Sequence, residues 1–145
     1  MATISRTFTV AADLQRTVAY LQDFSNAEEW EPGTVSCERH DDGEIRVGST
    51  WHNASKIAGI GTELIYELIE QAPDRLRFIG TNKTATSDDT MEFRTVEGGT
   101  EITYTAQIIF NGMAKVADVP ARLLFERVGG AVVDNLTSIL GTPEG

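Results

Sequence analysis

The stretch MAKVADVPARLLFERVGGAVVDNLTSIL, residues 113–140, decides the fold of this chain. Its apolar residues recur at the spacing of one helix face, through Leu124, Val128, Val132, Leu136 and Leu140. A single long helix needs a large partner for this stripe, because most helical stability in proteins comes from packing an apolar face. We therefore expect the rest of the chain to form a sheet that grips the helix.

Two features of this stretch constrain the helix. Pro120 cannot lie unperturbed in a helix interior, so the helix either begins near it, with Asp118 as cap, or is kinked there. Gly129 and Gly130 each lower intrinsic helicity by about 1 kcal/mol relative to alanine. A helix that tolerates both is held by packing, or it lets another segment approach its backbone closely.

The residues before this helix alternate with the two-residue period of β-strands. The pattern predicts strands at about 3–10, 34–39, 48–57, 63–71, 75–78, 91–94 and 102–110. Asp13 is a good N-cap for a short helix to about Leu21, and a second short helix fits residues 26–30. The predicted fold class is α+β, with a seven-stranded, curved antiparallel sheet around the C-terminal helix and two short helices after strand one. We expect residues 1–145 to form a single domain.

Composition excludes several classes of function. The chain has 12 basic and 22 acidic side chains and a formal charge of −10, which argues against nucleic acids and anionic membranes as partners. No segment resembles a signal peptide or a membrane span, so we expect a cytoplasmic protein that does not insert into membranes. Cys37 is the only cysteine, which excludes an internal disulfide and a cysteine-based zinc site. His40 and His52 have no third ligand at convincing spacing, so we predict no metal and no cofactor.

Several short stretches together resemble one family. They are DF at 23–24, WEPGTV at 30–35, VGSTW at 47–51, YELIE at 66–70, PDRLRF at 73–78 and GGTEIT at 98–103. The chain resembles the START/Bet v 1-like (SRPBCC) superfamily, and within it the bacterial polyketide cyclase/dehydrase-like proteins. The resemblance covers essentially the whole chain and implies the helix-grip fold. It does not choose a function, because that superfamily contains lipid carriers, receptors and cyclases.

The predicted ligand-binding residues share the inward parity of their strands or the stripe of the helix. They are Trp51, Asn53, Tyr66, Phe78, Met91, Phe93, Tyr104, Leu124 and Val128. We expect them to surround a cavity of a few hundred Å3, typical of ligand sites. Placing Trp51 inward turns His52 to solvent; a register shifted by one residue would instead make His52 the best general acid/base candidate. Otherwise the inward faces are expected to hold no acid/base pair, and catalytic residues are not assigned.

The favoured function is binding of a small hydrophobic or amphipathic molecule, such as a lipid, polyketide or aromatic metabolite, between the sheet and the C-terminal helix. The first alternative is a polyketide cyclase or dehydratase acting in the same cavity, which two or more inward ionisable groups would favour. The second is a protein-interaction module without a ligand. The expected assembly is a monomer or a homodimer.

Overall fold

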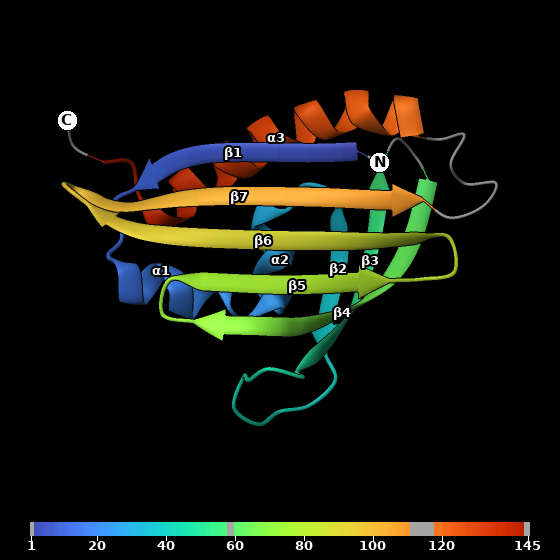
Figure 1. The fold of residues 1–145 in the computed structure, drawn as a ribbon, viewed down its shortest axis with the longest axis horizontal. Helices are drawn as coiled ribbons and strands as arrows, with labels where there is room; N and C mark the ends of the chain where they lie inside the picture. Colours follow the sequence, from blue (N-terminus) through green and yellow to red (C-terminus); the bar gives the residue numbers. More distant parts are fainter. Residues whose placement is uncertain (1, 58–59, 111–117, 144–145) are drawn as a thin grey trace.

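The computed structural model describes residues 2–57, 60–110 and 118–143, and it describes the side chains of these ranges except at 2, 57, 60 and 118–125. Within these ranges, seven antiparallel strands form one sheet in the order β1-β7-β6-β5-β4-β3-β2 (Figure 1). The strands are β1 (Ala2–Val10), β2 (Thr34–Arg39), β3 (Thr50–Ile57), β4 (Ile60–Ala72), β5 (Arg75–Thr81), β6 (Ala85–Val96) and β7 (Gly99–Phe110). This arrangement confirms the predicted α+β helix-grip fold.

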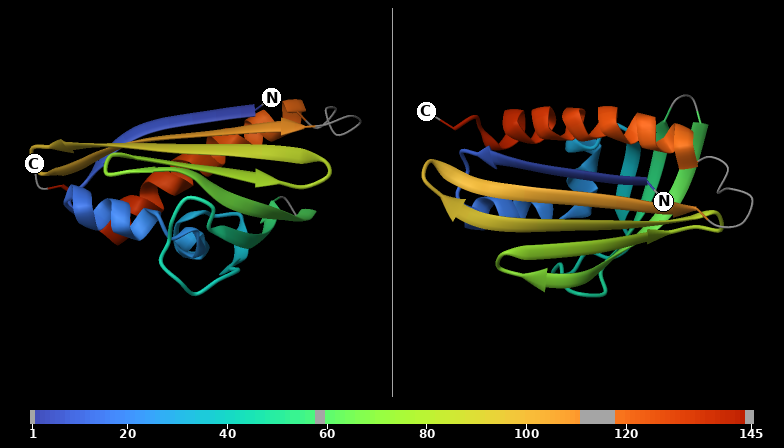
Figure 2. Two further views of the ribbon diagram at one scale, coloured as in Figure 1. Left: turned by 60° about the horizontal axis from the view of Figure 1, so that its bottom comes forward. Right: turned by 45° about the horizontal axis from the view of Figure 1, so that its top comes forward.

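The helices α1 (Leu14–Leu21), α2 (Ala27–Trp30) and α3 (Asp118–Leu140) lie on the same concave face of the sheet (Figure 2). Asp13 caps α1 as predicted, because its Oδ1 accepts a hydrogen bond of 2.8 Å from the Arg16 amide. A short 3-10 helix, η1 (Phe24–Asn26), comes directly before α2. The sheet curves around these helices, and register shifts in β4 between Leu68 and Glu70 and at the start of β2 help it to bend.

Helix α3 packs along β1 at Gly129, the first residue of the glycine pair. A Cβ atom on Gly129 would lie 2.9 Å from Cγ2 of Ile4 and 3.0 Å from Cζ of Arg6, so only a glycine lets the two backbones come this close. Gly130 faces open space and is exposed. Close approach of a neighbouring segment was one of the two explanations for the glycine pair, and it holds for Gly129.

Pro120 lies close to Asp118, the first described residue of α3. The expected start at residue 113, and with it the choice between a helix start near Pro120 and a kink there, lies outside the described residues.

Strand β3 has the predicted register. Trp51 and Asn53 are buried, whereas His52 faces outward, with its Nε2 3.2 Å from Oε1 of Glu63. Trp51 Nε1 donates to Oδ1 of Asp23 at 3.2 Å, and the same carboxylate oxygen accepts from the Ser25 amide at the start of η1. Asp23 therefore fixes η1 beneath β3.

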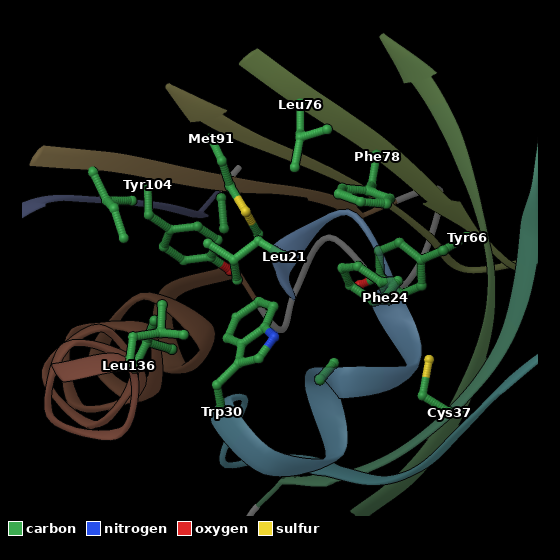
Figure 3. Close-up of a cluster of buried hydrophobic side chains, with 14 of the residues drawn as sticks. Leu21, Phe24, Trp30, Cys37, Tyr66, Leu76, Phe78, Met91, Tyr104 and Leu136 are labelled. Atoms are coloured by element: carbon green, nitrogen blue, oxygen red, sulfur yellow. The ribbon is translucent and has the colours of Figure 1, made fainter. Parts of the chain in front are cut away.

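A cluster of aromatic rings fills much of the concave face. Phe24, which follows Asp23 in η1, has its ring centroid 4.3 Å from that of Tyr66 and 4.7 Å from that of Phe78. Trp30, at the end of α2, lies between Leu136 of α3 and Phe24 (Figure 3). These rings leave only part of the space between sheet and helix open.

Candidate functional site

The remaining space is a cavity of about 90 Å3 between the sheet and α3. It is partly open and extends toward the end of the sheet where β4 begins and β7 ends, since Thr62 and Ile108 form part of its wall. The described residues that line it are Ile4, Phe24, Glu31, Thr34, Asn53, Ser55, Thr62, Leu64, Tyr66, Ser87, Asp89, Tyr104, Ala106, Ile108 and Val128. Eight of these residues are apolar or aromatic and supply most of the wall, and the seven polar ones come from the turn after α2 and from β2, β3, β4 and β6.

The central polar group of the cavity is the carboxyl of Asp89 on β6, a side chain that is only 5% exposed. Ser87 Oγ donates a hydrogen bond of 2.7 Å to its Oδ1. Tyr104 Oη, on the neighbouring strand β7, lies 3.4 Å from its Oδ2 and makes a longer contact. The alternation of β6 explains this placement, because Ser87, Asp89 and Met91 all point to the concave face.

Burial changes the acidity of this group of side chains. It raises the pKa of Asp89 from 3.8 to about 7, and the nearby negative charges of Glu31 and Asp88 act in the same direction. Ser87 and Tyr104 oppose the rise by hydrogen bonding to the carboxylate. Burial, followed by the charge of Asp89, also raises the pKa of Tyr66 and of Tyr104 well above 10. Both tyrosines therefore remain neutral hydroxyls, while Asp89 can exchange a proton near neutral pH.

Gly80 on β5 leaves the space that the Tyr66 ring occupies at the cavity. The two residues are cross-strand partners, and a Cβ atom on Gly80 would lie only 2.7 Å from the Tyr66 ring. The ring therefore lies directly against Gly80, where any larger residue would collide with it. Figure 3 shows Tyr66 between the strands of the sheet and Phe24, with Tyr104 on the other side of the concave face.

A chain of side-chain hydrogen bonds forms the second polar part of the wall. Ser55 Oγ donates to Asn53 Oδ1 at 2.6 Å, and Asn53 Nδ2 donates to Thr34 Oγ1 at 3.2 Å. Thr34 Oγ1 in turn donates to Glu31 Oε2 at 2.7 Å. The inward Asn53 predicted from the sequence is thus satisfied by protein groups, as buried amides normally are.

The structure brings four of the predicted ligand-binding residues to the cavity: Asn53, Tyr66, Tyr104 and Val128. Four others, Trp51, Phe78, Met91 and Phe93, are buried in the hydrophobic core and do not line it. The side chain of Leu124 lies outside the described ones. The expected volume of a few hundred Å3 was too large, because the aromatic cluster around Phe24 fills part of the space.

Sequence reasoning missed Asp89, Ser87 and Glu31. The expectation of no acid/base pair on the inward faces did not foresee this carboxyl, which is buried, can titrate near pH 7 and lies beside two tyrosines. A signal was present, since extending the inward parity of Met91 and Phe93 backwards along the strand reaches Asp89 and then Ser87. Glu31 gave no such signal, because it lies in the turn after α2.

Other reactive groups give the site no further chemistry. Burial raises the pKa of the Cys37 thiol to about 11, so it is a poor nucleophile. Across residues 2–57, 60–110 and 118–143, no group of three or more His, Cys, Asp or Glu side chains is placed to hold a metal ion. Of the helices in the described part of the chain, none is both long enough and apolar enough to cross a membrane.

Comparison with known families assigns the chain to a class. Residues 1–141 match the family model described as polyketide cyclase / dehydrase and lipid transport. Because the match covers nearly the whole chain, this protein belongs to that family, in agreement with the resemblance seen in the sequence. A search of the curated proteins finds no match.

Solved structures support the same fold. A START superfamily protein from Mycobacterium smegmatis has 15% identity and a TM-score of 0.77, with 97% of each chain covered. The Zhui aromatase/cyclase from Streptomyces sp. R1128 has 16% identity and a TM-score of 0.71, with 95% of this chain and 90% of that one covered. A protein from Rhizobium leguminosarum has 24% identity and a TM-score of 0.65, with 96% and 93% covered. The chain is thus similar to START proteins and to aromatase/cyclases, a class that includes ligand binders and cyclases.

Proposed function

We propose that this protein binds a small hydrophobic or amphipathic molecule in the cavity between the sheet and α3, with the whole chain acting as one ligand-binding domain. The observation that supports this proposal most strongly is the composition of the cavity wall. Apolar groups such as Ile4, Leu64 and Val128 surround a few polar groups centred on Asp89. This combination is typical of sites that enclose a ligand and orient it by one polar end.

The volume limits how much of the ligand the described residues enclose. An apolar cavity of about 150 Å3 holds a benzene molecule in another protein, and one water needs only about 10–15 Å3. The 90 Å3 found here suit a polar headgroup with part of a ring or a short chain. In this proposal Tyr66, Tyr104, Asn53 and Val128 contact the ligand, whereas Trp51, Phe78, Met91 and Phe93 support the wall from the core.

Native mass spectrometry of protein purified from its own host tests the proposal. The wild-type protein should carry a small co-purifying molecule. Ala106→Leu, a buried residue of the wall, should lose this ligand because the larger side chain occupies the cavity. Ala54→Leu on β3 is the matched control, since its side chain points to the opposite face from Asn53 and should leave the ligand bound. A wild-type protein that is ligand-free under these conditions would contradict the proposal.

One observation favours a second candidate, a cyclase or dehydratase acting in the same cavity. The Asp89 carboxyl titrates near neutral pH and lies next to the neutral hydroxyl of Tyr104, as general acid/base catalysis requires. Kinetics with an aromatic polyketide distinguish the two functions. An enzyme should lose turnover by about 100-fold or more in Asp89→Asn. A binding protein should show no turnover in the wild type.

A further inference from the structure

The carboxylate of Asp89 has unused capacity to accept hydrogen bonds. An ionised carboxylate offers about four acceptor positions. In the described part of the chain it receives one short hydrogen bond from Ser87, at 2.7 Å, and one long contact from Tyr104, at 3.4 Å. A buried polar group that is only partly satisfied is costly, so a ligand that donates a hydrogen bond to Asp89 gains more than one that cannot.

The charges around the cavity disfavour an acidic ligand. Asp89 and Glu31 both line it, and each bears a carboxyl group. Among the described lining residues there is no lysine, arginine or histidine that could neutralise a further negative charge. Placing the carboxylate of a fatty acid or an aromatic acid here would bury like charges together without a counter-ion, which costs several kcal/mol in other proteins.

Tyr66 adds a requirement for a hydrogen-bond acceptor on the ligand. Both tyrosines stay protonated, but the single O–H of Tyr104 already points to Asp89, which leaves that of Tyr66 to donate into the cavity. A ligand hydroxyl can donate to Asp89 and accept from Tyr66 at the same time. An ammonium group donates only, and a hydrocarbon does neither.

We infer that the polar end of the ligand is a neutral hydroxyl group, so that the cavity takes an alcohol or a phenol and rejects the corresponding carboxylic acid. The inference rests on the proposed function, because it specifies the ligand of that same cavity. In this arrangement the hydroxyl donates to Asp89, and the apolar part of the ligand lies against Leu64 and Val128.

The test uses four probes with one aromatic ring each, which extends from the enclosed 90 Å3 through the open side of the cavity: phenol, toluene, benzoate and benzylammonium. Each is titrated at pH 8 into the 15N-labelled full chain, and binding is followed through the backbone amides of residues 87–89 and 104–106. Phenol should bind most tightly. In Asp89→Asn the affinity for phenol should fall about tenfold, because a hydrogen bond to a charged acceptor is replaced by one to a neutral amide. Glu92→Gln removes a carboxyl from the outer face of the same strand and should leave the affinity unchanged.

The possible outcomes separate the inference from the proposed function. Benzoate, benzylammonium or toluene binding as tightly as phenol would overturn the inference while leaving a ligand-binding cavity in place. An unchanged affinity for phenol in a folded Asp89→Asn protein would overturn it as well. If that variant does not fold, the order of the four probes in the wild type decides alone. No binding of any probe would contradict the proposed function itself.

Discussion

Replacing Asp89 by asparagine should make the stability of this protein less dependent on pH. The folded state raises the pKa of this carboxyl from 3.8 to about 7, mainly through burial. Glu31, Asp88, Tyr66 and Tyr104 surround it, and their negative charge or hydrogen bonding modifies the effect of burial. An asparagine of nearly the same shape cannot ionise, and it can still accept the hydrogen bond from Ser87.

The direction of this pH dependence follows from which state, folded or unfolded, holds the proton on Asp89. Between about pH 4 and pH 7 the folded protein keeps a proton on Asp89 that the unfolded chain has released, so the free energy of unfolding falls as the pH rises. Above pH 7 Asp89 is ionised in both the folded and the unfolded state, and the free energy of unfolding falls no further. A difference of about three pH units at 1.36 kcal/mol each corresponds to a loss of up to about 4 kcal/mol. This is a large part of the 5–15 kcal/mol that typically stabilises a domain.

Urea unfolding at pH 5, 6, 7 and 8.5 measures this effect. The free energy of unfolding of Asp89→Asn should exceed that of the wild type increasingly as the pH rises, and this difference should grow by about 2.7 kcal/mol between pH 5 and pH 8.5, because about two of the three pH units lie in this range. Glu92→Gln, which removes an exposed carboxyl of the same strand, should follow the wild type at every pH. A constant difference between wild type and Asp89→Asn over this range would refute the reasoning, because it would mean that Asp89 titrates alike in both states.

Three further predictions concern packing, and urea unfolding at neutral pH measures each of them. Gly129→Ala should destabilise the protein by about 1–2 kcal/mol because its Cβ would collide with β1. Gly130→Ala should instead stabilise it by about 0.5–1 kcal/mol, because alanine has the higher helix propensity. Equal effects of the two substitutions would mean that α3 does not approach β1 at Gly129. Gly80→Ala should cost about 1–3 kcal/mol and displace the Tyr66 ring, visible as a changed near-ultraviolet circular dichroism spectrum; an unchanged spectrum would argue against the close contact of this ring with Gly80. Leu136→Ala should cost about 2–5 kcal/mol because the side chain is fully buried, and a change below about 0.5 kcal/mol would place it on the surface.

The alternation of the strands made most of the fold predictable. Large apolar residues such as Trp51 and Phe78 point inward, so their neighbours along each strand are assigned to a face by parity alone. The register of β3, with Asn53 inward and His52 outward, followed from Trp51 in this way. The helix stripe through Val132, Leu136 and Leu140 was equally clear, and all three side chains are buried.

The volume of the cavity could not be predicted in the same way. It depends on the short segment η1, whose three residues show no periodicity from which a face could be assigned. The Asp23 carboxylate ties this segment to Trp51, and this bond directs the Phe24 ring against Tyr66 and Phe78. Such a tertiary hydrogen bond between residues 28 positions apart has no local signature in the sequence.

Asp89 was missed for a different reason, because the predicted strand covered only residues 91–94, whereas β6 already begins at Ala85. Charged side chains are rarely buried, so no inward carboxyl was expected in the residues before Met91. The structure separates the two neighbouring aspartates: Asp88 pairs with Arg77 at 2.8 Å on the outer face, and Asp89 points into the cavity. Parity carried from Met91 along the whole strand would have separated them as well.

In the proposed function, the buried carboxyl would link the stability of this protein to a bound ligand. Without a ligand, Asp89 lowers the stability at alkaline pH, because its charge is poorly satisfied in the cavity. A molecule that donates a hydrogen bond to the carboxylate binds only the folded state, so it restores part of that stability by mass action. An apolar residue at this position would avoid the cost and would also remove the polar anchor. In the proposed function, the same side chain would thus reduce the stability of the ligand-free protein and provide the specificity for a ligand. Because it can exchange a proton near neutral pH, it is also the residue whose substitution distinguishes binding from catalysis.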